Sequence, residues 1–264
     1  MSTDVIFRKM KRYFAAASAA LLLLAGCSGE PAGDFITKTS SIDTGYTSLD
    51  ISGAIEVTYS FTADEMTVYG QENLLKYFRA ENEDGTLSLY VEANRVYNAK
   101  PIEVVLPGSM VLSSVSVTGA STFDSAMPLA ATAFSVSVSG ASEFVSDIEV
   151  ASDLTYVVSG ASKVTGSVTG KSAVVGVSGA SKADLSGKVN TLLLEVSGAS
   201  SFVGKTDGLF EADEASCDIS GASKAELTVN NTISGSVSGA SLLTYYGSAT
   251  STVSVTGDSS VDHR

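Results

Sequence analysis

Acidic side chains are the first candidates for chemistry in this chain of 264 residues. The densest group in its C-terminal half is Glu211, Asp213, Glu214 and Asp218. Several carboxylate oxygens close together could hold Ca²⁺, which prefers oxygen ligands. The alternative is a solvated acidic loop, because the four acids fall in the longest of the repeats described below. We favour the solvated loop and keep the calcium site as a hypothesis.

Three tyrosines are candidates for contact with a ligand. Tyr245 and Tyr246 are adjacent near the C-terminus, and Tyr97 lies in a polar segment from Asn94 to Lys100. An exposed tyrosine ring stacks readily on a sugar ring. Since neighbouring residues of a strand point in opposite directions, one ring of the adjacent pair should face outward. The simpler role for all three rings is to cover core gaps or the end of the fold.

Catalytic side chains are scarce. The only histidine is His263, next to last, and the segment from Val115 to Ser259 contains no arginine. A histidine-based triad and a histidine-supported metal site are therefore excluded there. We expect a protein without catalysis and without a cofactor. The alternative from another class is a polysaccharide-degrading lyase or hydrolase that works with clustered acids.

A short motif recurs through the C-terminal half and must set the positions of these side chains. The motif is Gly-Ala-Ser preceded by Ser or Thr, and it recurs every 18 to 23 residues. The last copy is degenerate, with Asp in place of Ala. Its glycines are Gly119, Gly140, Gly160, Gly179, Gly198, Gly221, Gly239 and Gly257. A fixed period of this size in a strand-rich composition is typical of a solenoid, in which each repeat is one coil.

Each glycine follows a stretch of alternating residues, as in Val136-Ser137-Val138, and an apolar residue such as Phe144 stands four positions after it. The pattern predicts one strand before and one strand after every corner. Glycine permits a positive φ at the corner, and buried serine hydroxyls can bond to the turn backbone. We therefore predict an all-β fold, a single-stranded parallel β-solenoid, right-handed, of about eight short coils over residues 111–264.

Residues 46–110 are less regular and should form a strand-rich cap over the first coil. Glu72 to Phe78 could make one or two helical turns, and Glu83-Asp84-Gly85 has the composition of a hairpin turn. The pair Gly53-Ala54 resembles a corner but lies far upstream of Gly119, so we do not count it in the regular series. Residues 46–264 together should form one continuous structural domain.

The N-terminus carries a targeting signal rather than part of the fold. Basic residues between Arg8 and Arg12 precede an apolar run that ends in Leu24-Ala25-Gly26-Cys27, which resembles a bacterial lipobox. The resemblance implies a signal peptide over residues 1–26, started from Met1 or Met10, and a membrane anchor through lipid on Cys27. Residues 27–45 would be the tether. By the sorting rules of such signals, Ser28 implies the outer membrane, with the side that the protein faces left open.

Net charge limits the possible binding partners, and the cysteine content limits the possible disulfides. The formal net charge is −13, and removal of residues 1–26, with four basic and one acidic residue, leaves 12 bases against 28 acids, or −16. Such a surface repels nucleic acid. Beyond Cys27 there is one cysteine, Cys217, so no intrachain disulfide can form, and its place in an apolar column predicts a buried side chain.

The order of a lipoprotein signal, a tether, strands ending near IEVVLPGS and coils with VSGAS corners resembles the bacterial auto-transporter adhesin, head GIN domain family. The resemblance covers roughly Tyr46 to Val255 and implies a β-helical fold at the cell surface. The family supplies no catalytic residues to carry over. We therefore expect a lipid-anchored adhesion or ligand-binding module with an envelope or extracellular glycan or protein as partner. A structural or assembly role in the envelope is the third possibility.

Overall fold

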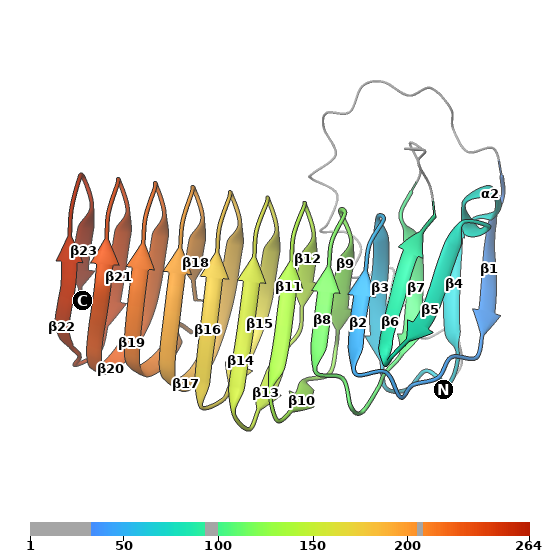
Figure 1. Cartoon of the computed structure of the whole chain (residues 1–264), viewed down its shortest axis with the longest axis horizontal. Coiled ribbons are helices and arrows are strands. Elements are labelled where there is room, and N and C mark those ends of the chain that lie inside the picture. Colours follow the sequence, from blue (N-terminus) through green and yellow to red (C-terminus); the bar gives the residue numbers. More distant parts are fainter. Residues whose placement is uncertain (1–32, 93–99, 205–207) are drawn as a thin grey trace, which may run out of the picture.

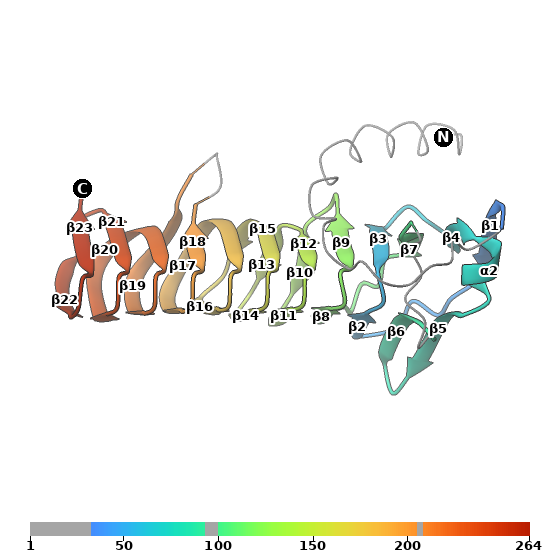
Figure 2. The ribbon, with the colours of Figure 1, turned by 90° about the horizontal axis from the view of Figure 1, so that it is seen from above.

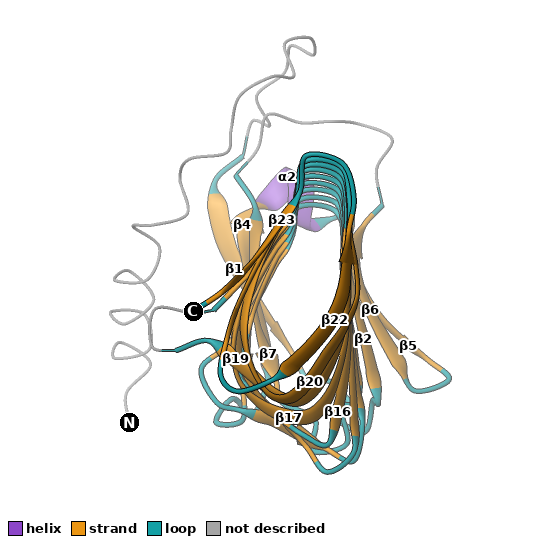
Figure 3. Ribbon diagram, turned by 90° about the vertical axis from the view of Figure 1, so that its left-hand side faces the viewer, coloured by secondary structure: helices purple, strands orange, loops and turns teal. Residues whose placement is uncertain are grey.

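The computed structural model describes residues 33–92, 100–204 and 208–264. They form a straight rod of stacked coils with the N-terminal part at one end and the C-terminus at the other (Figure 1). Seen along the rod, two sheets face each other and meet at a narrow glycine corner (Figure 3). We call the sheet whose strands precede the corners face 1 and the sheet whose strands follow the corners face 2. The parallel coils confirm the predicted β-solenoid.

Face 1 holds the strands before the glycines. In spatial order they are β5 (Phe78–Glu83), β6 (Thr86–Val91), β2 (Ser48–Ile51), β8 (Ser114–Val117), β11 (Phe134–Val138), β14 (Asp153–Val158), β16 (Ser172–Val177), the C-terminal parts of β17 (Lys182–Val196), β19 (Phe210–Ile219) and β20 (Lys224–Val237), and β22 (Thr250–Val255).

Face 2 holds the strands after the glycines. They are β1 (Phe35–Ser40), β4 (Met66–Gln71), β7 (Ile102–Pro107), β3 (Ile55–Ser60), β9 (Thr122–Ser125), β12 (Glu143–Val145), β15 (Lys163–Thr169), the N-terminal part of β17, β18 (Ser201–Val203), the N-terminal part of β20, β21 (Leu242–Tyr246) and β23 (Ser260–His263). The short strands β10 (Leu129–Ala131) and β13 (Ile148–Val150) lie along the edge opposite the corners, at the bottom of Figure 1. Seen from above, the two faces appear as two rows of strands (Figure 2).

Glycine is required at the corners because the coils approach each other there backbone to backbone. Gly179 has φ of 80°, and a Cβ on it would lie 2.5 Å from the carbonyl oxygen of Gly160. The next residue, Ala180, donates its N–H to that same oxygen over 2.8 Å. A side chain at the glycine would therefore push the coils apart. All eight glycines of the predicted series have positive φ.

The corner serines form the ladder that the sequence predicts. Ser162 donates its backbone N–H to Ser181 Oγ in the next coil, and Ser181 donates its own N–H to Ser200 Oγ, each over 3.3 Å. These serines are only 1–3% exposed from Ser121 to Ser241. Most of these hydroxyls thus accept from a buried backbone N–H at the corner, whereas Ser223 Oγ donates to Gly198 O.

Aliphatic columns between the two faces make a continuous core. Val138, Val158 and Val177 follow one another on face 1, each at most 1% exposed. The rings of Phe123 and Phe144 stack at a centroid distance of 5.1 Å. Cys217 is buried as predicted, and burial raises the pKa of its thiol to about 12. The thiol is therefore a small apolar core group rather than a nucleophile.

The structure of the N-terminal end shows that the prediction for Gly53 was wrong. Gly53 is a corner of the regular series, because β2 and β3 pair in parallel with β8 and β9, and Ala54 N–H donates to Gly119 O over 3.0 Å. The chain leaves the rod after β3 and returns at β8, so two neighbouring coils are far apart in sequence. In the segment between β3 and β8, the strands β6 and β7 form a further coil that stacks on β2 and β3.

Antiparallel strands then close this end of the rod. β1 and β4 continue face 2, and β5 continues face 1, each antiparallel to its neighbour. Residues 35–40, which the sequence assigned to the tether, are therefore part of the fold. The predicted helical turn is α2 (Glu72–Leu75), and Asp84 and Gly85, with φ of 49° and 78°, form the predicted hairpin turn. No helix among the described residues is long and apolar enough to cross a membrane.

Candidate functional site

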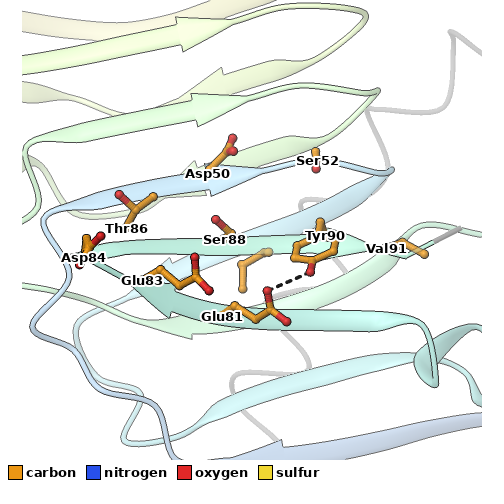
Figure 4. Close-up of a pocket in the computed structure, with 10 residues that line it drawn as sticks. Asp50, Ser52, Glu81, Glu83, Asp84, Thr86, Ser88, Tyr90 and Val91 are labelled. Carbon is orange, nitrogen blue, oxygen red and sulfur yellow. Dashed lines mark hydrogen bonds between the residues drawn. The ribbon is translucent and has the colours of Figure 1, made fainter.

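An open polar groove lies at the capped end of the rod, on the outer side of face 1 (Figure 4). The β5–β6 hairpin bends away from the plane of the coils (Figure 3), and the groove lies where the hairpin meets β2. The groove has a volume of about 560 Å³. Its lining residues are Asp50, Ser52, Glu81, Glu83, Asp84, Thr86, Ser88, Leu89, Tyr90 and Val91.

Strand alternation brings the polar side chains of the groove to one surface. Ser88 is the Cα partner of Asp50 on β2 and of Glu81 on β5, so the three residues form a row across the strands. Leu87 and Leu89 alternate with these residues along β6 and are fully buried, although Leu89 also borders the groove. The buried leucines therefore fix which side chains face the groove.

Tyr90 and Glu81 make the main polar contact inside the groove. Tyr90 donates its hydroxyl to Glu81 Oε2 over 2.9 Å, as the dashed line in Figure 4 shows. This hydrogen bond is the largest cause of the raised pKa of Tyr90, so the phenol keeps its proton. The contact holds the half-buried ring in place beside Ser52.

The lining of the groove is acidic, with four carboxylates and no basic residue. The nearby Arg79 turns elsewhere, because its guanidinium bonds to Glu92 and to the carbonyl oxygens of Lys76 and Phe78. Carboxylates accept hydrogen bonds from ligand hydroxyl or ammonium groups, and a tyrosine ring offers a flat surface. This combination suits a polar ligand with many hydroxyl groups.

A row of hydroxyl side chains runs from the groove along the rod. Its members are the outward-facing residues that directly precede the corner glycines: Ser52, Thr118, Ser139, Ser159, Ser178, Ser197, Ser220, Ser238 and Thr256. Successive strands are about 4.8 Å apart, so the row offers a regular series of donors and acceptors beyond Tyr90.

The four acids predicted as a possible calcium site do not form one cluster, and two of them contact Lys188. Lys188 Nζ lies 2.7 Å from Glu211 Oε1 and 3.8 Å from Asp213 Oδ1. Asn230 Nδ2 donates to Glu211 Oε1 over 2.9 Å. These acids lie on the strand β19 rather than in a bulging loop.

The other two acids of that group do not join them. Asp218 accepts hydrogen bonds from the backbone and hydroxyl of Ser236, and Glu214 is exposed. Among the residues that the structure describes, no three His, Cys, Asp or Glu side chains converge as they would around a metal ion.

The predicted tyrosines are separated by the strand alternation. Tyr245 is 5% exposed and stacks on His263 at a centroid distance of 4.5 Å. Tyr246 is half-buried on the outside and donates its hydroxyl to Glu226 over 3.0 Å. Tyr97 and Cys27 lie outside the described residues, so their predicted roles stay predictions.

A second hollow, apolar and of about 260 Å³, lies on the edge opposite the corners. Phe61, Leu112 and Leu129 line it together with Met110 and Met127, which are 83% and 54% exposed. Its volume is below the 300–1,000 Å³ of ordinary ligand pockets, whereas the groove lies within that range.

Sequence reasoning missed the groove residues Asp50, Glu81 and Tyr90. The turn at Asp84-Gly85 and the alternation of Thr86–Val91 were visible, and they place Tyr90 on the outer side of a strand. Two features create the groove: β6 pairs with β2, and the β5–β6 hairpin bends outward. Both depend on long-range pairing that no local pattern encodes.

The strand order and the end strands together define a capped parallel β-solenoid. The chain belongs to the family described as "Putative auto-transporter adhesin, head GIN domain", whose model matches residues 45–249. This membership confirms the resemblance found in the sequence. No curated protein is similar enough in sequence to match the chain.

Solved structures show the same fold at low sequence identity. A putative adhesin from Parabacteroides merdae is 18% identical with a TM-score of 0.81, over 89% of this chain and 98% of that one. A putative adhesin from Parabacteroides distasonis is 18% identical with a TM-score of 0.80, over 89% and 99%. A putative lipid binding protein from Parabacteroides distasonis is 16% identical with a TM-score of 0.67, over 88% and 98%.

Proposed function

We propose that this protein is a non-catalytic, lipid-anchored adhesin of the cell envelope that binds a glycan in the groove beside Tyr90. The observation that carries the proposal is the groove itself, in which one tyrosine ring, four carboxylates and several hydroxyls share an open surface. Family membership and the adhesin-like neighbours support a binding role at the cell surface or envelope.

The proposed anchor also bears on which glycan the groove would meet. Cys27 is eight residues from Phe35 in β1, so at most about 28 Å of extended chain separates them. β1 belongs to the capped end, which also carries the groove. An anchored rod would therefore hold the groove close to its own membrane, and the partner we propose is a polysaccharide of the same envelope.

A hydrolase is the second candidate, because Asp50, Glu81, Glu83 and Asp84 gather around one groove. Paired carboxylates are the catalytic groups of most glycoside hydrolases. A lyase is not supported at this site, because no lysine or arginine among the lining residues could serve as the base. An envelope assembly role remains the third candidate.

Binding and turnover measured on the same glycans separate the first two candidates. The mature chain should be retained on a printed glycan array and should leave the retained glycans uncut. Cleavage that Glu81→Gln abolishes would replace the proposal with the hydrolase. Retention on envelope proteins with no glycan bound would favour the assembly role.

The anchor needs its own measurement. Cells given a radiolabelled fatty acid should label the chain, and Cys27→Ser should remove both the label and recovery in the membrane fraction. Protease treatment of whole cells would show which side of the outer membrane the protein faces. An unlabelled wild-type chain would rule out the anchor, and with it the argument for a polysaccharide of the same envelope, but it would leave glycan binding in the groove unaffected.

A further inference from the structure

The C-terminal end of the rod exposes its core. Val255 of β22 is 45% exposed, whereas Val237, its Cα partner in the preceding coil, is fully buried. Val261 of β23 is partly exposed, whereas its partner Leu243 is fully buried. These residues occupy inward columns of the solenoid and lack only the next coil.

The same end presents free strand edges on both faces. In the described part of the chain, β22 pairs only with β20, and β23 pairs only with β21. Thr256 and Ser260 donate their N–H groups back to the preceding coil. Because backbone groups alternate in direction along a strand, those of Ser251, Val255 and Val261 point away from the rod.

Protective features that usually block a free edge are missing on β22. Its sequence TSTVSV contains neither a charged residue nor a proline. Asp262 pairs with Thr244 in an outward column, so it points sideways rather than along the rod. By contrast, the antiparallel strand β5 at the other end carries Glu81 and Glu83 and bends away from the coils.

We infer that two copies of this chain associate through their C-terminal ends. A single extended peptide would cover one edge and leave the other edge and the core valines exposed. The same end of a second copy has two edges at the same separation and the same apolar centre, so it can cover all three. A two-fold axis across the junction makes the new strand pairs antiparallel. Since the N-terminal ends are capped, the assembly closes at two copies.

Val255→Lys tests the inference, with Val157→Lys as the matched control. Val157 is 51% exposed in an outward column of face 1, so the same substitution there leaves the rod end unchanged. We expect the mature full-length chain to sediment as a dimer in analytical ultracentrifugation. Val255→Lys should weaken the dimer at least about thirtyfold, and Val157→Lys should leave it intact.

Cross-linking adds a readout that does not depend on one substitution. In a Cys27→Ser background, Ser254→Cys should be joined to a second copy by a short bifunctional maleimide, whereas Ser137→Cys, in the same column within the rod, should not. Circular dichroism would show that each variant keeps its strands. A monomeric wild-type chain, or a dimer that Val157→Lys disrupts and Val255→Lys does not, would overturn the inference.

Discussion

The backbone N–H of Ser162 lies 3.3 Å from Oγ of Ser181, one coil further along the rod. The two serines stand at equivalent corners, and both are 2% exposed. The same contact recurs between Ser142 and Ser162 and between Ser181 and Ser200. One side chain type repeated at one position therefore links the coils at the corner, where the strand ladders are interrupted.

Ser181→Ala should destabilise the protein by about 1–3 kcal/mol, because it leaves the buried N–H of Ser162 without an acceptor. Ser178→Ala is the matched control, since Ser178 stands on the outer side of the strand before the same corner. Urea unfolding would measure both. Equal midpoints for the two variants would show that the ladder adds no stability.

Gly179→Ala should cost more than about 2 kcal/mol, because the new Cβ would lie 2.5 Å from Gly160 O at a residue with φ of 80°. Gly176→Ala should be neutral or stabilising by up to about 1 kcal/mol, because its Cβ would be 3.9 Å from the nearest atom, Tyr156 O. Thermal unfolding of the two variants tests the requirement for glycine. A stable Gly179→Ala variant would contradict the tight corner.

Tyr156→Phe should leave stability unchanged or raise it by about 1 kcal/mol. The Tyr156 hydroxyl is buried and has no hydrogen-bond partner among the described residues, so its removal relieves an unsatisfied group. Burial raises the pKa of this phenol, and the ring contact with Phe144 survives the change. A clear loss of stability in calorimetry would reveal a partner for the hydroxyl.

Glu56→Gln should raise the melting temperature at neutral pH. Burial, and then the charge of Glu103 on the neighbouring strand, raise the pKa of Glu56 in the folded protein. The folded state therefore prefers the protonated carboxyl, and the stability that this preference gives is lost as pH rises through the folded pKa.

The gain from Glu56→Gln should shrink below about pH 4, where the wild-type carboxyl is protonated in both states. Glu149→Gln is the control, because Glu149 is exposed on β13. A gain at neutral pH that stays the same in acid would contradict the electrostatic explanation.

The regular half of the fold could be predicted because its determinants are local and repeated. The residues around Gly140 and Gly179 carry a strand pattern, a corner and a buried serine within a few positions, so the period alone gives the stacking. The coil at Gly53 could not be assigned, because β6 and β7 are inserted between it and Gly119 in sequence and lie outside it in space.

The sequence predicts the kinds of side chain found at the candidate site but not their location in the fold. The predicted acids and two of the three predicted tyrosines lie in the C-terminal repeats, where Lys188 binds Glu211 and Tyr245 is buried. The groove instead combines Asp50 with Glu81 and Tyr90 through long-range pairing of β2, β6 and β5. No spacing in the sequence reveals which distant strands become neighbours.

Binding of Tyr90→Ala and Tyr246→Ala on the same glycan array tests the central claim most directly. Both tyrosines are half-buried and donate to a glutamate, over 2.9 Å to Glu81 and 3.0 Å to Glu226, but only Tyr90 lines the groove. We predict that the wild-type chain binds, that Tyr90→Ala loses at least about tenfold in affinity, and that Tyr246→Ala binds like wild type. No glycan binding by the wild type, or full binding by Tyr90→Ala, would contradict the assignment of the groove.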